Sequence, residues 1–464
     1  MKRLISVIIT LFIIISALPV LAAALTGDVN GDGQLNNKDV VALFRYVSGS
    51  KDAVKDASAC DYNGDGEVDN KDVVAMFKAV SGTDPGLVFE ELILYPSNEY
   101  THEIDASAYE DEYDLRYLYI MIDRSRNHIS PGERFQLRFA VSNPEFRISV
   151  KDVALSIESG SQFASLTDDG VFTAKAVGDV KIKAYLKAKP DTVSETTVHI
   201  TTPQNKETMW KGSGTFRDPY LVSTVKDFLN IQKISKYNGY SDEVDTCWFR
   251  QTNDIDFSGV DYEPGCFAHN YDGNGFKLLN ITVDETVSNC GSVFGDCRCC
   301  VIKNVTVENF TYVRNGYTGV GNTGVFFGTS KHLTAYNCRA VNAVINIEDN
   351  GTWNGSAGGF VGHEVEECSY VNCSTDATVN GIFYVGGFIG DSEAFVSMYV
   401  NCRATGTASA KIKQSSGFDV YGGFTGNQIP HGPNSDMYEL SHQYFDCYSA
   451  QYDKMLEVNN IITE

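Results

Sequence analysis

A short glycine-rich block recurs five times in the second half of the chain and constrains its fold more than any other feature. It reads GSVFG at 291–295 and returns at intervals of 33, 34, 28 and 36 residues, as GVFFG at 324–328, GGFVG at 358–362, GGFIG at 386–390 and GGFTG at 422–426. A second block follows each: KNVTV at 303–307, YNCRA at 336–340, VNCST at 371–375, VNCRA at 400–404 and FDCYS at 445–449. Such a period with short alternating strands indicates the stacked turns of a solenoid. We expect the glycines to permit tight corners and Phe, Val and Ile to fill the interior.

This region, residues 207–464, resembles the Gly-rich repeats of right-handed parallel β-helices in bacterial surface proteins and adhesins. Its lead-in, GSGTFRDPYLVSTVKDFLNIQKI at 212–234, contains a helix-period segment. We expect that segment to cap the first turn, and the stretch from NDIDFSG at 253–259 onward to form the opening turns.

Cysteine usage favours stacking over disulfide bonding. All but one of the 12 cysteines lie from Cys247 onward, and four occupy one position of the second block: Cys338, Cys373, Cys402 and Cys447. Equivalent positions stack about 4.8 Å apart, so these thiols should form a buried ladder of small apolar groups. Disulfides between them are the alternative, although their geometry along such a stack is poor. Unpaired thiols in a secreted protein indicate an anaerobic habitat.

The segment CRCC at 297–300 has two interpretations. Its three thiols could seed a zinc or iron–sulfur site, with Cys290 as the nearest further ligand. Packing of a small buried residue before VIKNVTV is the alternative.

The same acidic dodecapeptide occurs twice near the N-terminus, as DVNGDGQLNNKD at 28–39 and DYNGDGEVDNKD at 61–72. Oxygen-bearing side chains stand at positions 1, 3, 5, 9 and 12, a backbone carbonyl serves at position 7, and glycine at position 6 allows a sharp turn around an ion. Asx-rich surface turns are the alternative, but two matching copies favour calcium loops. The predicted ligands are Asp28, Asn30, Asp32, Gln34, Asn36 and Asp39, then Asp61, Asn63, Asp65, Glu67, Asp69 and Asp72.

A helix-period segment follows each loop, VVALFRYVSG at 40–49 and VVAMFKAVSG at 73–82. No comparable helix precedes either loop, whereas an ordinary EF-hand has helices on both sides. This duplicated loop and helix, residues 25–84, resembles a type I dockerin, the module that attaches cellulosomal proteins to cohesin domains of a scaffoldin. We expect the two helices to bury Leu43, Phe44, Met76 and Phe77 against each other.

The resemblance implies two Ca²⁺ ions and a cohesin partner. Cohesin contacts then come from loop positions 10 and 11 and from the following helix, which here are Asn37, Lys38, Arg45, Asn70, Lys71 and Lys78. The Ser-Thr pair familiar at positions 10 and 11 is absent, so the identity of the cohesin stays open. The two copies are nearly identical on this face, so either could dock after a half-turn of the module. A solvated loop edge is the alternative for the Asn-Lys pairs.

Residues 1–24 have Lys2 and Arg3, then an apolar run, then small residues suited to cleavage, as a secretory signal peptide does. No second hydrophobic span of membrane length occurs, so no membrane insertion is expected after cleavage. The net charge of −23 disfavours nucleic acid and anionic lipid as partners. The expected location is extracellular, attached to a cellulosome at the surface of an anaerobic bacterium.

Residues 87–202 are β-like, with runs such as FQLRFAV at 135–141 and VKIKAYL at 180–186 between turn glycines. DGVFTAKAVG at 169–178 resembles the strand–turn–strand of a bacterial group 2 immunoglobulin-like β-sandwich, a fold that usually serves as a spacer. The usual core Trp before it is replaced by LSIESG. The stretch 87–125 fits no named pattern.

The chain is therefore expected to be multidomain and mainly β, with a small α calcium-binding dockerin, an Ig-like sandwich and a right-handed parallel β-helix. Two functions stay open. The β-helix could bind a polysaccharide or a cell surface within a polysaccharide-degrading complex, or it could be a polysaccharide hydrolase or lyase delivered by the dockerin. A glycosidase needs two carboxylates at a defined separation. The most enzyme-like pair is Asp254 and Asp256, for which a structural role is favoured. No catalytic motif is found beside His363 and His431 or among the other candidate acids, which are Asp272, Glu364, Glu366 and Glu367.

Overall fold

The structure is a computed structural model that describes residues 29–31, 36–55, 57–60, 62, 68–80, 118–119, 126–137, 140–141, 152–187, 189–203, 207–235, 247–284, 290–315, 321–348, 355–365, 368–393, 397–411, 421–428, 443–445, 447–450 and 461–462. The chain divides into two compact units, Met1–Phe89 and Glu90–Glu464. The predicted signal peptide lies outside the described residues. Within the described ranges, no helix is both long and apolar enough to cross a membrane.

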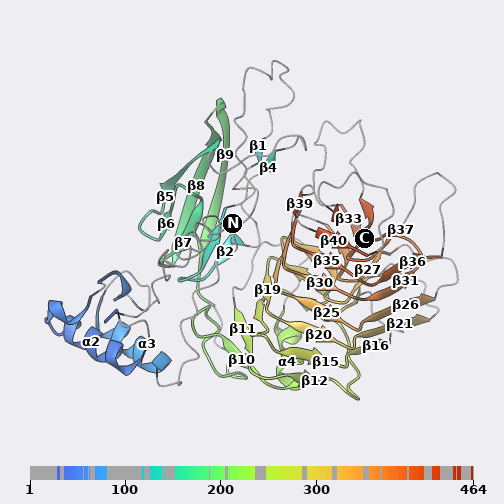
Figure 1. Ribbon diagram of the computed structural model, residues 1–464, viewed down its shortest axis with the longest axis horizontal. Helices are drawn as coiled ribbons and strands as arrows, with labels where there is room; N and C mark the ends of the chain where they lie inside the picture. Colours follow the sequence, from blue (N-terminus) through green and yellow to red (C-terminus); the bar gives the residue numbers. More distant parts are fainter. Residues whose placement is uncertain are drawn as a thin grey trace, which may run out of the picture. The chain divides into compact units, whose positions relative to one another are not determined.

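The first unit contains one helix after each dodecapeptide, as predicted. These are α2 (Asn37–Val47) and α3 (Asn70–Val80), with the 3-10 turns η1 (Lys51–Ala53) and η2 (Ala57–Ala59) between them (Figure 1). Asn36 begins α2 as its N-cap, and its side-chain oxygen accepts a hydrogen bond from the Lys38 amide at 2.9 Å. The two helices share a small core, whose fully buried members include Leu43, Met76 and Tyr62.

The second unit begins with two β-sheets packed around one core. One sheet has the order β2 (His128–Ile129), β9 (Lys189–Ile200), β8 (Gly178–Leu186) and β5 (Val153–Ser159); the other has the order β3 (Arg134–Gln136), β7 (Val171–Ala174) and β6 (Ala164–Leu166). A separate pair joins β1 (Leu118–Tyr119) to β4 (Ala140–Val141). Alternate residues of β8 face the core, namely Val180, Ile182, Ala184 and Leu186. The prediction of sheets from alternation in this region is therefore confirmed.

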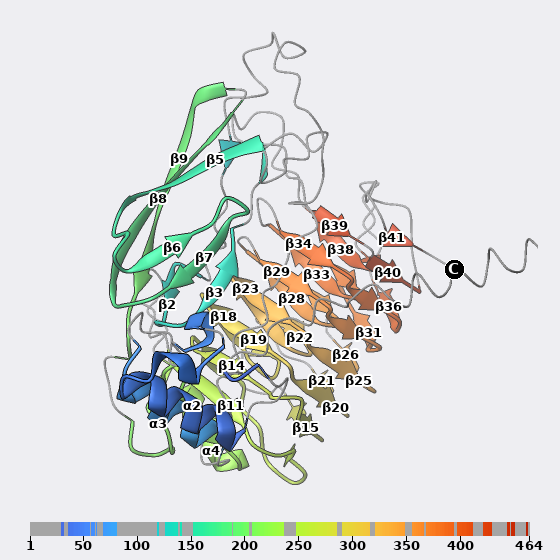
Figure 2. The same ribbon diagram turned by 60° about the vertical axis from the view of Figure 1, so that its left-hand side comes forward.

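The remaining strands form a β-solenoid of five parallel sheets, here called faces 1 to 5 (Figures 1 and 2). Face 1 consists of β10 (Tyr220–Val222), β11 (Trp248–Gln251), β14 (Asn270–Asp272), β19 (Val301–Lys303), β24 (Thr334–Tyr336), β29 (Ser369–Val371), β34 (Met398–Val400) and β39 (Gln443–Phe445). Face 2 consists of β12 (Ile255–Asp256), β15 (Lys277–Leu279), β20 (Thr306–Glu308), β25 (Arg339–Val341), β30 (Ser374–Thr375), β35 (Arg403–Ala404), β40 (Cys447–Ser449) and β41 (Ile461–Ile462).

The other faces are shorter. Face 3 consists of β13 (Cys266–Phe267), β18 (Asp296–Arg298), β23 (Phe327–Lys331), β28 (Val361–Glu364), β33 (Ile389–Ser392) and β38 (Thr425–Gln428). Face 4 consists of β16 (Thr282–Asp284), β21 (Thr311–Asn315), β26 (Val344–Glu348), β31 (Thr378–Gly381) and β36 (Thr407–Ala410). Face 5 consists of β17 (Cys290–Gly291), β22 (Asn322–Gly324), β27 (Ala357–Gly358), β32 (Val385–Gly386) and β37 (Tyr421–Gly422). The solenoid prediction is confirmed, while its right-handedness stays a prediction.

The predicted capping helix is also present, as α4 (Val225–Ile234). Thr224 is its N-cap and exchanges hydrogen bonds with Asp227 in a capping box. The helix inserts Phe228 and Ile231 into the solenoid core, where Phe228 meets Phe257 edge-on with ring centroids 5.6 Å apart. This apolar contact covers the interior of the first turns.

The solenoid interior is a stack of equivalent side chains. Phe326, Phe360, Phe388 and Phe424 of the glycine-rich block follow one another with ring centroids 4.3, 4.7 and 4.9 Å apart. Tyr370 and Tyr399 form a parallel stack beside them at 5.3 Å. Aromatic side chains therefore fill the interior at the spacing of the turns, as the repeat predicts.

The tight corners between faces 1 and 2 use asparagine in addition to glycine. In the first of them Asn274 and Gly275 are left-handed, with φ of 52° and 81°; in the later ones the left-handed residues are Asn304, Asn337, Asn372 and Asn401, with φ of 54°, 52°, 53° and 49°. Their side chains link successive turns, as between Asn401 Nδ2 and Asn372 Oδ1 at 2.9 Å. Asn tolerates this conformation better than most residues and adds a side-chain hydrogen bond.

The block glycines are needed for a different reason, which is close backbone approach. A Cβ on Gly358 would lie 2.6 Å from the amide nitrogen of Gly390, and one on Gly386 would lie 2.7 Å from that of Gly426. Any side chain at these positions would push neighbouring turns apart.

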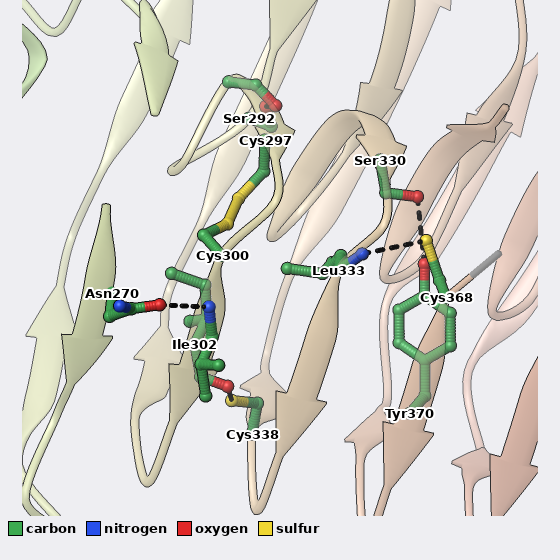
Figure 3. Close-up of a disulfide and its surroundings, with 12 residues drawn as sticks. Asn270, Ser292, Cys297, Cys300, Ile302, Ser330, Leu333, Cys338, Cys368 and Tyr370 are labelled. Atoms are coloured by element: carbon green, nitrogen blue, oxygen red, sulfur yellow. Dashed lines mark hydrogen bonds between the residues drawn. A yellow bond between two sulfur atoms is a disulfide. The ribbon is translucent and has the colours of Figure 1, made fainter. Parts of the chain in front are cut away.

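The predicted cysteine ladder is confirmed. Its members, Cys338, Cys373, Cys402 and Cys447, are fully buried and not bonded to one another. Each thiol faces a face 1 carbonyl of the preceding turn; Cys338 Sγ, for example, lies 3.4 Å from the Ile302 oxygen (Figure 3). Burial raises the pKa of the Cys338 and Cys402 thiols well above the usual value.

The metal interpretation of CRCC is wrong, because Cys297 and Cys300 form a disulfide across the corner that leads from face 3 to face 1 (Figure 3). Cys299 between them is buried with a φ of 50°. The pairing was missed because two cysteines three residues apart bond only where the backbone turns sharply.

A buried carboxyl group lies inside the corner between faces 3 and 1. Glu364 of β28 is fully buried, and its Oε2 accepts hydrogen bonds from Ser392 Oγ at 2.6 Å and Tyr399 OH at 2.7 Å. Burial raises the pKa of Glu364, although these hydroxyl groups act in the opposite direction. The folded state therefore holds this proton more tightly than the unfolded chain, so the stability linked to it is present at low pH and lost as pH rises through the raised pKa.

Cysteine labelling tests the burial of the ladder. Among described unpaired cysteines, Cys266 is the one that is half-exposed, and burial together with the Asp296 charge raises its pKa to about 11. We expect iodoacetamide to modify Cys266 in the native protein at a rate that rises with pH, and the ladder thiols only after unfolding. Peptide mapping by mass spectrometry reads out both, and native labelling of Cys373 would contradict the stack.

Glu364→Gln tests the buried carboxyl, because the amide keeps its shape without titrating. We expect the Tm difference between variant and parent to move in favour of the variant as pH rises from about 4 to about 8. Calorimetry across that range measures it, with the exposed Glu348→Gln on β26 as control. A pH-independent difference would show that Glu364 does not bind its proton more tightly on folding.

Candidate functional site: two loop-helix segments

The two dodecapeptides are described in part. Asn30, Asn36, Asp39, Asp69 and Asp72 lie within the described residues. The other predicted ligands lie outside them: Asp28, Asp32, Gln34, Asp61, Asn63, Asp65 and Glu67.

In the first loop, the Asp39 side chain at position 12 contacts the residues at positions 3 and 9. Asp39 at position 12 has no solvent exposure, and its Oδ1 lies 2.7 Å from Asn30 Nδ2 at position 3. Its Oδ2 accepts a hydrogen bond from the backbone of Asn36 at position 9, at 2.9 Å. The helix start thus holds a buried carboxylate against the opposite side of the loop.

The second loop repeats this arrangement. Asp72 is also fully buried, and its Oδ2 accepts from the Asp69 amide at 2.8 Å. Asp69 Oδ1 in turn accepts from the Lys71 amide at 2.6 Å. The duplicated sequence therefore produces duplicated geometry at the described positions.

These residues fit a calcium ion. Ca²⁺ takes carboxylate, amide and backbone oxygens in a flexible shell, and a carboxylate at position 12 is central to such loops. Carboxylates as fully buried as those of Asp39 and Asp72 are costly to keep charged, and a bound cation offsets that cost. The described ligands would be Asn30, Asn36 and Asp39 in the first loop, and Asp69 and Asp72 in the second.

The expected burial of the helix residues is half wrong. Leu43 and Met76 are fully buried as predicted, but Phe44 and Phe77 are each 54% exposed. The core between two helices of 11 residues each is too small to cover every apolar side chain of the stripe. Phe44 and Phe77 lie at its edge and face solvent.

The exposed phenylalanines belong to a matching pair of surfaces, here called the first and second helix faces. The described side chains of the first are Asn37, Lys38, Val41, Phe44 and Arg45, and those of the second are Asn70, Lys71, Val74 and Phe77. Val41 and Val74 are 49% and 53% exposed. Of the large apolar residues that are exposed in the described part, most lie in this unit, although it is the smaller one. Exposed apolar patches of this kind mark binding surfaces.

The first helix face is hollowed. A cavity of about 430 Å³ is lined by Asn37, Lys38, Val41, Ala42, Arg45 and Ala53. Three of the predicted partner-binding residues, Asn37, Lys38 and Arg45, therefore line one depression together with an exposed valine. On α3, Asn70 and Lys71 are exposed, and Lys78 belongs to the last turn.

Sequence reasoning missed the apolar half of these faces. Val41, Phe44, Val74 and Phe77 follow the loop lysines at i+3 and i+6, on the side away from Leu43 and Met76. The signal was available, because a stripe this wide exceeds what one neighbouring helix can cover.

Residues 26–81 match the family model of the dockerin type I domain. Domains of this family in general bind calcium and cohesins. The dockerin prediction is confirmed for this segment, and an extracellular, cellulosome-type protein is implied.

The other comparisons add little. No curated protein matches the chain. A crystal structure of a candidate immunoglobulin A1 protease from Bacteroides ovatus is 19% identical, with a TM-score of 0.39 over 54% of this chain and 79% of that one. A similarity at this level supports no conclusion about function.

The sequence-selected acids of the solenoid do not form a site together. Asp256 Oδ1 accepts from Asn280 Nδ2 and Ser258, and these hydrogen bonds lower the pKa of Asp256. Asp254 Oδ1 accepts from the Lys277 amide at 2.9 Å. Asp272 pairs with Arg250 at 3.3 Å, and Glu366, Glu367 and His431 lie outside the described residues. Asp254 and Asp256 have structural partners, as favoured.

Removal of a position-12 carboxylate tests the loops. We expect Asp39→Asn and Asp72→Asn each to weaken one class of Ca²⁺ sites in the full chain by more than about tenfold, because changes even outside the first coordination shell cost about 10- to 100-fold. Isothermal calorimetry measures this, with the exposed Asp52→Asn in η1 as the matched control. Unchanged titrations in both variants would disprove the assignment.

Proposed function

We propose that this chain is a secreted component of a cellulosome-type complex. Its dockerin domain binds two Ca²⁺ ions, and one of the two helix faces then docks on a cohesin domain of a scaffoldin. The β-helix presents a surface for a polysaccharide or cell-surface ligand. The 1–24 leader directs secretion, and an Ig-like sandwich serves as a spacer.

The observation that carries this proposal is the duplicated helix face. Each copy combines an exposed apolar pair with a basic residue at the start and another near the end of the helix, on a segment that begins at a calcium-type loop. A lone copy could be a surface irregularity. Two copies with the same exposed residues support two equivalent docking surfaces, of which one is used at a time.

Support for glycan binding through aromatic stacking is weaker. In the described turns of the solenoid, aromatic side chains are buried or half-buried. The described outer surface is instead polar and carries ladders of amides, such as Asn342 Nδ2 to Asn309 Oδ1 at 2.6 Å. A glycan ligand would therefore be held there by hydrogen bonds.

A polysaccharide hydrolase or lyase is the second candidate. One observation favours it: Asp391 and Glu393 place two carboxylates beside His363 on face 3. Paired carboxylates are what glycoside cleavage requires. Release of reducing sugar from plant polysaccharides by the parent, lost in Asp391→Asn, would establish this alternative.

Cohesin binding tests the main proposal. With a panel of purified type I cohesins, we expect Val41→Ala with Phe44→Ala to leave affinity nearly unchanged, because the second helix face still docks. Val74→Ala with Phe77→Ala should also leave the affinity nearly unchanged, because the first helix face still docks. All four together should reduce affinity by about 30-fold or more, as loss of buried aromatic anchors costs about 2 kcal/mol or more.

The control is Met209→Ala, which removes an exposed apolar side chain outside the dockerin domain. Replacing both asparagines and both lysines of the loops should also abolish binding. Full affinity of the fourfold apolar variant, or cohesin binding that survives Ca²⁺ removal, would contradict the proposal.

A further inference from the structure

Three side chains that can bind metal converge at face 3. His363 of β28 stands opposite Asp391 of β33 in the parallel register, and Glu393 follows directly after β33. One nitrogen and two carboxylate oxygens from these residues lie within 4.8 Å of one another. Among the described residues, this is the one group of three His, Cys, Asp or Glu side chains with such geometry.

The imidazole points at both carboxylates without bonding either. His363 Nε2 lies 3.7 Å from Asp391 Oδ2 and 3.7 Å from Glu393 Oε2, which is too long for a hydrogen bond. The Nε2 atom is nevertheless buried and has no hydrogen-bond partner. A buried polar atom of this kind calls for an explanation, and an ion is one.

The surroundings concentrate negative charge. The Asp391 side chain is 8% exposed and that of His363 17%, while Glu393 opens to solvent at 46%. Burial and the charges of Asp391 and Glu393 raise the pKa of Tyr384. Two carboxylates in a half-buried setting repel each other unless a cation lies between them.

We propose that His363, Asp391 and Glu393 bind a divalent transition-metal cation of the zinc class. Zn²⁺ takes imidazole nitrogen and carboxylate oxygen at about 2.0–2.2 Å, which places neighbouring ligand atoms of a tetrahedron about 3.4 Å apart. The two 3.7 Å separations need only a slight contraction to reach that spacing. Ca²⁺ prefers shells of oxygen alone, so this site differs in kind from the dockerin loops.

Asn322 provides a sharper criterion. Its Nδ2 lies 3.3 Å from His363 Nδ1, and its Oδ1 accepts from the Ser356 amide and hydroxyl at 3.2 and 3.0 Å. Binding through Nε2 needs the ring proton on Nδ1, so the amide must turn its oxygen toward the ring at the expense of the Ser356 amide. Asn322→Asp would remove this conflict, because a carboxylate accepts from both groups.

The test is a titration of the full chain with Zn²⁺ in excess Ca²⁺, which fills the dockerin loops. We expect His363→Ala and Glu393→Gln to lose one equivalent of Zn²⁺ or to bind it more than about tenfold more weakly. Asn322→Asp should bind Zn²⁺ about tenfold more tightly than the parent, as outer-shell partners are worth about 10- to 100-fold. Co²⁺ in place of Zn²⁺ gives the coordination number from its visible spectrum.

His199→Ala is the matched control. His199 Nδ1 lies 2.8 Å from Asp179 Oδ1, and among the described residues no second acid completes a metal-binding group with this pair. This variant should bind Zn²⁺ like the parent. Equal Zn²⁺ affinity of the parent, His363→Ala and Asn322→Asp would overturn the proposal. His363, Asp391 and Glu393 would then form a cluster of ion pairs without a metal. Since Glu393 is partly exposed, Glu393→Gln keeps the test decisive if His363→Ala fails to fold.

Discussion

Parallel stacking at one fixed spacing is the constraint on which most of this structure depends. Successive turns lie about 4.8 Å apart, so every side chain meets its own equivalent above and below. A residue type that fits at one position of the turn must therefore be able to stack on its own kind in the turns above and below. Flat aromatic rings satisfy this requirement, because Phe360 and Phe388 stack within 6° of parallel. Asparagine amides do so by donating to the amide of the preceding turn, and thiols by facing a carbonyl of the preceding turn.

The dockerin loops depend on a different constraint, which is the cost of gathering carboxylates. Asp39 and Asp72 lie in the first turn of their helices and are fully buried, and each accepts a hydrogen bond from the backbone amide three residues before it. Each therefore helps to cap its helix and is also a candidate ligand. Negative charge at a helix N-terminus is favourable. One aspartate therefore links ion binding to helix formation, and the helix in turn orients Val41 and Phe44. Calcium binding and partner binding are then expected to be coupled through the first turn of each helix.

Much of the fold could be predicted from the sequence, because repeats make each signal appear several times. The solenoid, the cysteine ladder and the capping helix α4 all follow from patterns that recur or adjoin a recurring block. The roles of individual residues were harder. Glycine and asparagine both suit tight corners, and only the structure shows that Asn337 makes the corner while Gly358 allows backbone contact.

The candidate sites divide in the same way. The calcium loops are local in sequence, so their spacing alone predicts them. The His363 cluster is not, because Asp391 lies 28 residues away and joins His363 only through the register of two strands. Phe44 and Phe77 fit an apolar period whether they are buried or exposed, and the size of the core decides between the two. Features that depend on residues close together in the sequence were predictable. Features that depend on contacts between neighbouring turns of the solenoid, or on the size of the core, were not.

At the start of the solenoid, the repeating turns are joined to the two packed sheets that precede them in the chain. Trp248 of β11 donates a hydrogen bond from Nε1 to Glu133 Oε1 at 2.9 Å. The same oxygen also accepts a hydrogen bond from the Ser130 amide at 2.7 Å. Arg126 forms an ion pair with the other carboxylate oxygen of Glu133 at 3.4 Å. The side chains of Arg126, Glu133 and Trp248 are all buried. A buried ion pair of this kind adds little net stability, but breaking it is costly. Its value therefore lies in specificity: an apolar contact would tolerate sliding along the stacked strands, whereas the indole N–H of Trp248 needs the Glu133 oxygen directly opposite it. This hydrogen bond therefore contributes to the register in which the two packed sheets meet the first turns, where no preceding turn of the repeat can supply it.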